Sequence, residues 1–151
     1  MGSNHNPLSQ GAMTEIHMVQ GCLTRFSFLL WLIILNRLPT ANRLVRHNII
    51  SSDNCVLCQL HYENVDHLFF DCNFVRLVWQ YVISGSYNIL PMPWTDLLPT
   101  LLQQNRLRNL EPKKWIGTLA YYVWHERNSR CFGGVALSPS NLSNLILSAL
   151  L

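Results

Sequence analysis

The sequence predicts a mainly α-helical protein, folded as one small domain in which a loop rich in cysteine joins the helices. Apolar residues recur at helical spacing in several segments, and proline or glycine separates those segments. Four soft metal-binding side chains follow one another in the middle of the chain as C-x2-C-x8-H-x4-C. The length of 151 residues is that of one domain.

The composition indicates a surface with few charged residues. Hydrophobic residues make up 49% of the chain and charged residues 13%, well below the usual quarter. Such a surface is poorly solvated, so we expect a chain that packs against a larger protein or is marginally soluble alone. The net charge of +3 is no strong basic signal. Most of the cations are arginines, which mildly favours a partner that carries phosphate or carboxylate groups. Ordinary surface arginines on helices would give the same composition.

Residues 1–22 have no hydrophobic periodicity and are predicted to be a disordered leader. Residues 26–35 are the most apolar run, but this run has about half the length that a bilayer span needs. It follows a neutral polar leader, which is unlike a secretory signal. We therefore expect a buried helix and an intracellular protein with reduced thiols, in the nucleus or the cytoplasm, without a membrane partner.

The first helix is predicted over residues 24–38. Its apolar residues recur at helical spacing: Phe28, Trp31, Leu32 and Leu35. Pro39 ends it, because proline cannot continue a helix. Thr40 then caps a second helix over residues 41–48.

Arginines gather around this second helix. Arg43 and Arg46 are three residues apart, so a helix places them on one face, and Arg37 precedes the turn. We interpret these three residues, with Arg76 further along the chain, as candidate nucleic-acid-binding residues, because arginine forms paired hydrogen bonds with phosphate. Ordinary surface cations on helices would give the same pattern.

The four soft ligands are Cys55, Cys58, His67 and Cys72. Three thiolates and one imidazole are a complete tetrahedral donor set for a structural Zn²⁺ ion. A closed donor set leaves no position for a catalytic water, so the motif indicates a scaffold. The predicted fold is therefore a small helical domain pinned by a Cys3His zinc-binding loop.

Other interpretations of these cysteines stay open. A redox-active Cys-x-x-Cys pair and unrelated buried thiols are both compatible with the spacing. His61 is an alternative imidazole, although His67 pairs more naturally with Cys72. On one continuous helix His67 and Cys72 would lie about 140° apart, so we expect a break or a tightened turn between them. Cys22 and Cys131 have no partner motif and are predicted to be core thiols.

Three further helices are predicted. One begins at Cys72 and extends through residue 82, and a short one reaches residue 105 from a cap at Thr95 after a loop at residues 85–93. The last begins at Pro112, and along one of its sides stand Trp115, Leu119, Tyr122 or Val123, and Glu126. Gly133 and Gly134 stop it. Residues 134–151 are predicted to be a short, truncated apolar tail.

Several motifs occur in order between residues 26 and 79: Leu-Leu-Trp-Leu, Asn-Arg-Leu-Pro-Thr, Cys-Val-Leu-Cys, Val-Asp-His-Leu-Phe-Phe-Asp-Cys and Val-Trp. With these motifs, residues 25–82 resemble the zinc-binding domain that lies C-terminal to the reverse transcriptase in plant LINE-type (non-LTR) retrotransposons. The segment Trp-His-Glu-Arg-Asn at residues 124–128 is similar to the region C-terminal to that domain in such elements. The resemblance implies that the same four residues are the metal ligands. Asn73 departs from the family, which often has proline there.

The resemblance also implies a parent protein whose polymerase, and often nuclease or RNase H, performs the chemistry. The eight acidic residues of this chain include no paired set of the kind that binds two metal ions in such enzymes. Asp66 and Asp71 flank ligands instead, where they orient the imidazole, balance charge or are simply solvated. No Gly-rich phosphate loop is present. We therefore predict a non-catalytic chain.

Residues 23–84 are predicted to be the reverse-transcriptase-type zinc-binding domain, and residues 85–133 a helical extension. The leading hypothesis is a module that helps to hold RNA or DNA through the four candidate arginines. The alternative is a structural or protein-interaction segment that packs on the reverse transcriptase of its parent protein. A third possibility is a remnant of a mobile element without a selected function.

Overall fold

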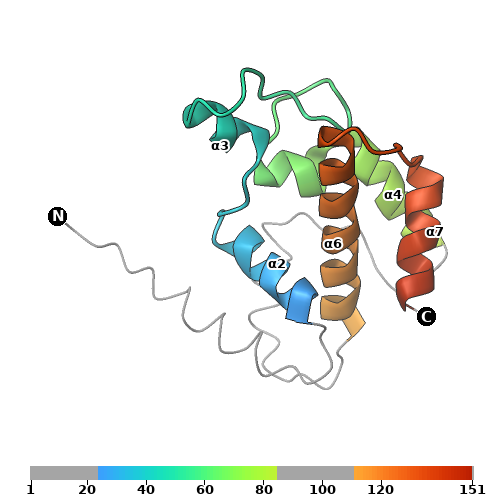
Figure 1. Cartoon of the computed structure of the whole chain (residues 1–151). Coiled ribbons are helices and arrows are strands. Elements are labelled where there is room, and N and C mark those ends of the chain that lie inside the picture. Colours follow the sequence, from blue (N-terminus) through green and yellow to red (C-terminus); the bar gives the residue numbers. More distant parts are fainter. Residues whose placement is uncertain (1–23, 85–110, 151) are drawn as a thin grey trace.

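The computed structural model describes residues 24–84 and 111–150, and this part of the chain is helical with no strand (Figure 1). In chain order its elements are α2 (Thr24–Ile34), α3 (Ala41–Arg46), the π-helix η1 (His67–Asp71), α4 (Asn73–Ser84), α6 (Glu111–Cys131) and α7 (Pro139–Leu150). The predicted mainly α-helical fold is confirmed. The predicted leader and the short helix to residue 105 lie outside the described residues.

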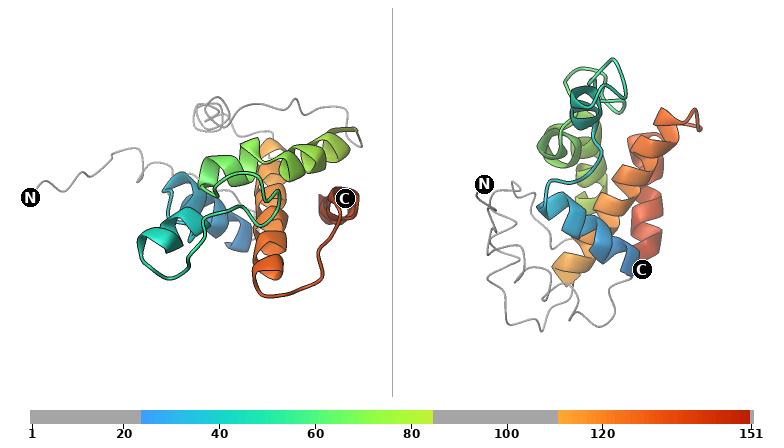
Figure 2. Two further views of the ribbon diagram at one scale, coloured as in Figure 1. Left: turned by 90° about the horizontal axis from the view of Figure 1, so that it is seen from above. Right: turned by 60° about the vertical axis from the view of Figure 1, so that its left-hand side comes forward.

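The long helix α6 organises the bundle. Helix α2 packs against α6, and α7 packs against both α6 and α4 (Figure 1). Helix α3 and the metal loop, which we define as residues 53–72, lie at the end of the bundle where α6 terminates (Figure 2). The metal loop thus lies at one end of the bundle, and its buried residues, among them Leu57 and Leu68, belong to the same core as the helices.

One hydrophobic core joins the four longer helices. Its buried side chains include Leu30 and Ile33 of α2, Val75, Val78 and Val82 of α4, Ile116, Leu119 and Val123 of α6, and Leu142 and Ile146 of α7. Gly117 lies where α2 meets α6, and a Cβ atom there would stand 3.3 Å from Leu30 Cδ1. The two helices approach closely because this position has no side chain.

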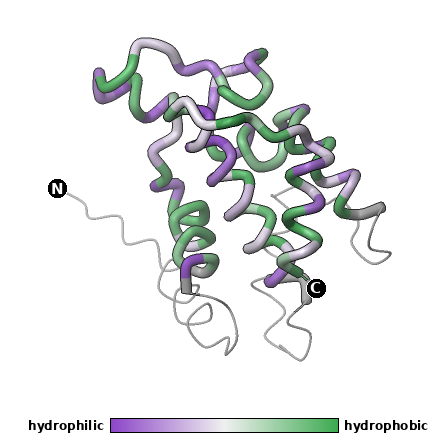
Figure 3. Tube along the Cα trace, turned by 45° about the vertical axis from the view of Figure 1, so that its right-hand side comes forward, coloured by the Kyte–Doolittle hydropathy of each residue, from purple (hydrophilic) through white to green (hydrophobic). Residues whose placement is uncertain are grey.

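The helical spacing of Phe28, Trp31, Leu32 and Leu35 does not mark the buried face of α2. Phe28 is 57% exposed, whereas Phe26, Leu29 and Leu30 are buried. Figure 3 shows the reason, because α2 is hydrophobic over most of its surface. A helix that is apolar on several sides has no single stripe, so residue spacing alone cannot select the buried face.

Helices α2, α3 and α6 end in the same way, with a left-handed residue that follows the cap. These residues are Asn36 (φ 51°), Asn48 (φ 56°) and Gly133 (φ 76°). After α2, the Asn36 N–H donates to the Ile33 carbonyl at 2.9 Å and the Arg37 N–H to the Leu32 carbonyl at 2.8 Å. This pair of bonds is a Schellman motif. Helix α2 thus ends at Ile34, before Pro39, and not at residue 38 as predicted.

The predicted apolar tail contains a helix. Helix α7 has 12 residues, and Leu142 and Ile146 on its inner side are almost fully buried. Its packing on α4 and α6 makes it part of the core. The division of the chain into domains at residues 84 and 133 stays a prediction. Among the described helices, none has both the length and the apolar character that a membrane span requires.

Candidate metal centre

The first half of the metal loop is a short hairpin with a turn at its tip. The Cys55 N–H donates to the His61 carbonyl at 2.8 Å, and the Glu63 N–H donates to the Asp53 carbonyl at 2.6 Å. At the tip, the Gln59 N–H donates a hydrogen bond to the Cys55 carbonyl at 2.8 Å. Gln59 has φ 58°, which lets the chain reverse immediately after Cys58. This turn places two cysteines on one side of the hairpin.

The second half of the loop is the π-helix η1. At its start, Asn64 Oδ1 accepts from the His67 N–H at 2.7 Å. The Cys72 N–H donates to the His67 carbonyl at 2.7 Å, an i to i+5 bond, and Cys72 itself is extended. The predicted break between these two ligands is confirmed. The turn is wider than an α-turn and not tighter, because the π geometry brings residues five apart back toward the same side.

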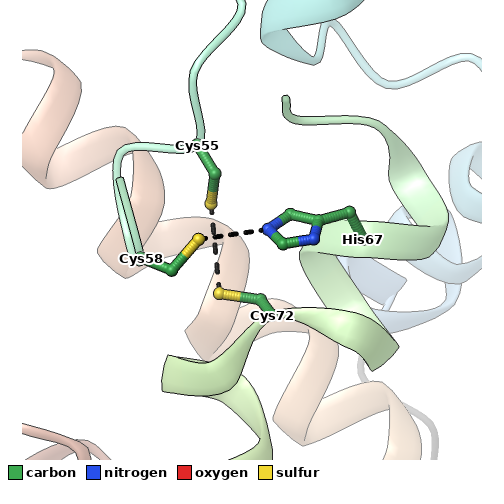
Figure 4. A group of neighbouring side chains, drawn as sticks. All are labelled: Cys55, Cys58, His67 and Cys72. Atoms are coloured by element: carbon green, nitrogen blue, oxygen red, sulfur yellow. Dashed lines mark hydrogen bonds between the residues drawn. The ribbon is translucent and has the colours of Figure 1, made fainter. Parts of the chain in front are cut away.

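The four predicted ligands converge on one point (Figure 4). Their Sγ and imidazole nitrogen atoms all lie within 4.8 Å of one another. Cys55 Sγ and Cys72 Sγ are 4.0 Å apart, and Cys58 Sγ is 3.3 Å from His67 Nε2. Tetrahedral zinc with bonds of about 2.0 to 2.3 Å separates its donor atoms by about 3.5 to 3.8 Å. The cluster therefore has the size and donor set of a Cys3His zinc site.

The surroundings of the cluster favour a structural role. Cys55 and Cys72 have no exposed surface, and His67 is buried, so an ion held by them is shielded from solvent. The Leu60 N–H approaches Cys58 Sγ at 3.5 Å, and a backbone donor of this kind stabilises a thiolate. Four protein donors fill a tetrahedral shell, which leaves no position for a substrate.

The choice of His67 over His61 is supported by the geometry. His61 is exposed, and its ring centroid lies 5.5 Å from that of His67. Asp66 and Asp71 are also exposed, and Asp71 pairs with Arg76 at 3.5 Å. Asn64, which the sequence did not single out, is the residue that positions the His67 backbone.

The described cysteines are all free thiols. Cys131 is exposed at the end of α6, so its prediction as a core thiol is wrong. It lies on the outer side of the last turn of the helix. The sequence around Cys131 contains no motif that indicates which side of the helix the thiol occupies. Cys22 lies outside the described residues.

The protons of the two buried thiols are coupled. A hydrogen bond from Cys55 lowers the pKa of Cys72, burial opposes this effect, and the Val75 and Phe74 N–H groups at the start of α4 lower it further. The same bond, together with burial, raises the pKa of Cys55. Cys72 is thus the first of the pair to become a thiolate, at a helix N-terminus that favours negative charge.

Burial, with a smaller contribution from His61, lowers the pKa of His67 below its ordinary value of 6.5. The unfolded chain therefore binds a proton at His67 as the pH falls through 6.5, while the folded chain does not. Stability is expected to decrease from about pH 6.5 downward, because the unfolded state then binds more protons. Protons also compete with the metal for all four ligands, which acts in the same direction.

Urea unfolding of the zinc-loaded chain at a series of pH values measures this effect. The chain with His47→Gln, an exposed histidine outside the loop, should give the same pH profile. A free energy of unfolding that stays constant from about pH 7.5 to 5.5 would contradict the expected linkage.

Residues 5–79 match the family model described as zinc-binding in reverse transcriptase. This matched segment, just under half of the chain, is similar to the zinc-binding region of reverse transcriptases. The match contains all four ligands of this zinc-binding domain and the hairpin that presents them. Comparison with curated proteins and with solved structures finds no match.

A buried ion pair anchors the zinc-binding domain to α6, and the sequence did not predict it. Glu63, in the metal loop, is 1% exposed, and its Oε1 accepts from Arg127 Nη2 at 2.7 Å. Arg127 Nε lies 3.0 Å from the same oxygen and 3.1 Å from Oε2, which makes the pair bidentate. The Arg127 guanidinium also stacks on Trp124, 4.9 Å from the ring centroid.

The same carboxylate caps α3. The Ala41 N–H donates to Glu63 Oε1 at 2.8 Å, whereas Thr40, at the N-cap position, forms no capping hydrogen bond with its side chain. Thr40 therefore occupies the predicted N-cap position, but its side chain does not supply the capping hydrogen bond. A buried carboxylate 22 residues away in the chain replaces it, because a charged acceptor binds the first amides of a helix more strongly than a hydroxyl.

A second ion pair lies on α6, and its arginine stands three residues further along the helix than Arg127. Arg130 Nε donates to Glu126 Oε1 at 2.8 Å, and that oxygen also accepts from the Leu137 N–H at 2.9 Å. The Arg130 guanidinium lies 4.6 Å from the centroid of Phe74, at the start of α4. The sequence signal for this second pair was the spacing of Glu126 and Arg130, four residues apart on one helix. No local pattern indicated the pair of Arg127 with Glu63.

The structure brings two of the four candidate arginines together. Arg43 and Arg46 line one pocket beside the metal loop. Arg37 is exposed in the turn after α2, and Arg76 is exposed on α4. Neither of these two lines that pocket. The face that Arg43 and Arg46 share is thus the strongest candidate for phosphate contacts.

Proposed function

We propose that this chain is a non-catalytic zinc-binding module of a retrotransposon-derived reverse transcriptase protein, and that it assists the binding of RNA or DNA. The observation that carries the proposal is the pair Arg43 and Arg46 at a pocket beside the Cys3His cluster. In this proposal Zn²⁺ occupies the cluster through Cys55, Cys58, His67 and Cys72 and has a structural role.

The zinc site supports this role by fixing α3. Glu63 lies between the ligands Cys58 and His67 and caps α3, so the folded loop and the arginine-bearing helix form one unit. Among the described residues, Arg37 and Arg46 form no ion pair, which leaves their charges available to phosphate. Arginine at a rigid surface forms paired hydrogen bonds with phosphate oxygens at little cost in side-chain entropy.

The parent protein supplies the chemistry in this proposal. The family of the matched segment points to a reverse transcriptase, and the motifs of residues 25–82 resemble those of plant LINE-type elements. The module would then hold template RNA or target DNA for that polymerase. Phosphate contacts give an affinity that depends strongly on salt and little on sequence.

Replacing both Arg43 and Arg46 by alanine is expected to weaken the binding of single-stranded RNA by about tenfold or more. Two lost phosphate contacts should also lower the slope of log K against log salt by about 1.4. Fluorescence anisotropy at several salt concentrations measures both quantities. Lys114→Ala is the matched control, because Lys114 is an exposed cation near the start of α6. Unchanged binding in the double variant would remove these arginines from the interface.

A protein-interaction role is the second candidate, and exposed apolar side chains favour it. Phe132 and Val135, just after α6, are both 87% exposed, and Leu60 on the metal loop is 67% exposed. Such residues commonly contact another protein. If this role is the main one, the isolated chain will sediment as an oligomer or aggregate and will retain no nucleic acid in a salt-dependent manner.

A further inference from the structure

A pocket of about 280 Å³ lies beside the metal loop. The end of α2, helix α3 and the residues before η1 supply its walls. Its polar lining includes Asn36, Asn42, Arg43, Arg46, Asn64 and Asp66, and Ile33, Ile34 and Val65 add a smaller apolar surface. Cations, amides, a carboxylate and an apolar wall thus meet in one small space.

We propose that this pocket binds one unpaired nucleotide of a single-stranded nucleic acid. The inference rests on the proposed function and deepens it. Arg43 and Arg46 bind the phosphate, the apolar wall contacts the face of the base, and Asn42 and Asp66 bind its edge. The function proposed above needs only the phosphate contacts, whereas this inference adds a contact to the base.

Asp66 is the observation that points beyond a plain phosphate site. A carboxylate repels phosphate, so its presence beside two arginines weakens a site built for phosphate alone. A carboxylate accepts hydrogen bonds from exocyclic amino groups, such as N4 of cytosine. Uracil has a carbonyl oxygen at the same position and would be repelled. We therefore expect the pocket to prefer cytosine to uracil.

The size of the pocket favours an unpaired base. A volume of about 280 Å³ lies just below the range of about 300 to 1,000 Å³ for ligand pockets, which suits one nucleotide and nothing larger. In a duplex the base edges are paired and the faces are stacked, so no base can enter. Proteins that read single strands place bases that have left the stack in pockets of this kind.

The pocket is built before any ligand binds. Arg43 Nη1 donates to the Asn36 carbonyl, which holds the guanidinium at the wall. The Asn42 N–H donates to the Glu63 carbonyl at 3.0 Å, and Asn64 Oδ1 accepts from the N–H of the ligand His67 at 2.7 Å. The first of these two bonds joins α3 to the metal loop, and the second fixes the part of the loop that lines the pocket, so the pocket is already organised in the folded domain.

Fluorescence anisotropy of the full, zinc-loaded chain with labelled oligocytidine, oligouridine and a duplex of equal length tests the inference. We expect oligocytidine to bind about tenfold more tightly than either competitor at one salt concentration. Asp66→Asn should abolish the preference for cytosine over uracil and keep the salt dependence. Asp71→Asn, a change at an exposed aspartate that does not line the pocket, should keep both. Zinc content and circular dichroism verify that each variant is folded.

The outcomes separate this inference from the function on which it rests. Salt-dependent binding that is equal for all three ligands overturns the nucleotide pocket and leaves the proposed function intact. A preference for cytosine that survives Asp66→Asn also overturns the pocket, because the base is then read elsewhere. The absence of salt-dependent binding to any of the three overturns the proposed function together with the inference.

Discussion

Chelation of the metal is expected to unfold the metal loop and to lower the stability of the chain by an amount on the order of 10 kcal/mol. Between the two arms of the hairpin there is one isolated bridge, at Asn54 and Tyr62, so the backbone ladder alone holds the ligand-bearing arms together weakly. Without the ion, the buried thiols of Cys55 and Cys72 and the imidazole of His67 lose the partner that holds them together. The helices of the core are expected to stay folded after chelation has unfolded the loop.

Metal analysis of the purified chain, with far-ultraviolet circular dichroism before and after chelation, measures this effect. We expect about one zinc ion per chain, and none in the variant Cys72→Ser. Cys131→Ser is the matched control, because this exposed cysteine lies outside the cluster and should leave the zinc content unchanged. A metal-free chain that remains fully folded would refute the structural zinc site.

The replacement Arg127→Ala is expected to lower the free energy of unfolding of the zinc-loaded chain by about 3 to 5 kcal/mol. It leaves the Glu63 carboxylate, which is 1% exposed, buried and without its cation. The matched control is Arg76→Ala, which removes the exposed pair with Asp71 and should cost less than about 1 kcal/mol. Urea unfolding of both variants measures the difference.

A double variant tests whether the cost arises from the unpaired charge. Glu63→Gln with Arg127→Met removes both charges and keeps a side-chain carbonyl oxygen that can cap α3 at Ala41. Replacing a buried ion pair by neutral groups of similar volume is often close to neutral, so the double variant should recover most of the lost stability. If Arg127→Ala and Arg76→Ala cost the same, the buried pair does not anchor the metal loop.

Local features of this protein could be predicted because neighbours in the chain produce them. The ligand set Cys55, Cys58, His67 and Cys72 follows from spacing and donor chemistry, and the structure brings its four donor atoms within 4.8 Å of one another. The need for a break between His67 and Cys72 follows from helix geometry. Helix α6 was predicted with a side that carries Leu119 and Glu126, and both are buried.

Contacts between distant segments determined the features that residue spacing could not predict. The inward face of α2 was chosen by packing against α6, because α2 is apolar on several sides. Glu63 lies 64 residues from Arg127 in the chain, and no local pattern connects a loop carboxylate to a helix arginine over that distance. The pocket at Arg43 likewise needs α2, α3 and the residues before η1 to meet. Spacing and donor chemistry act within one segment, whereas burial and ion pairing depend on which segments the folded chain brings together.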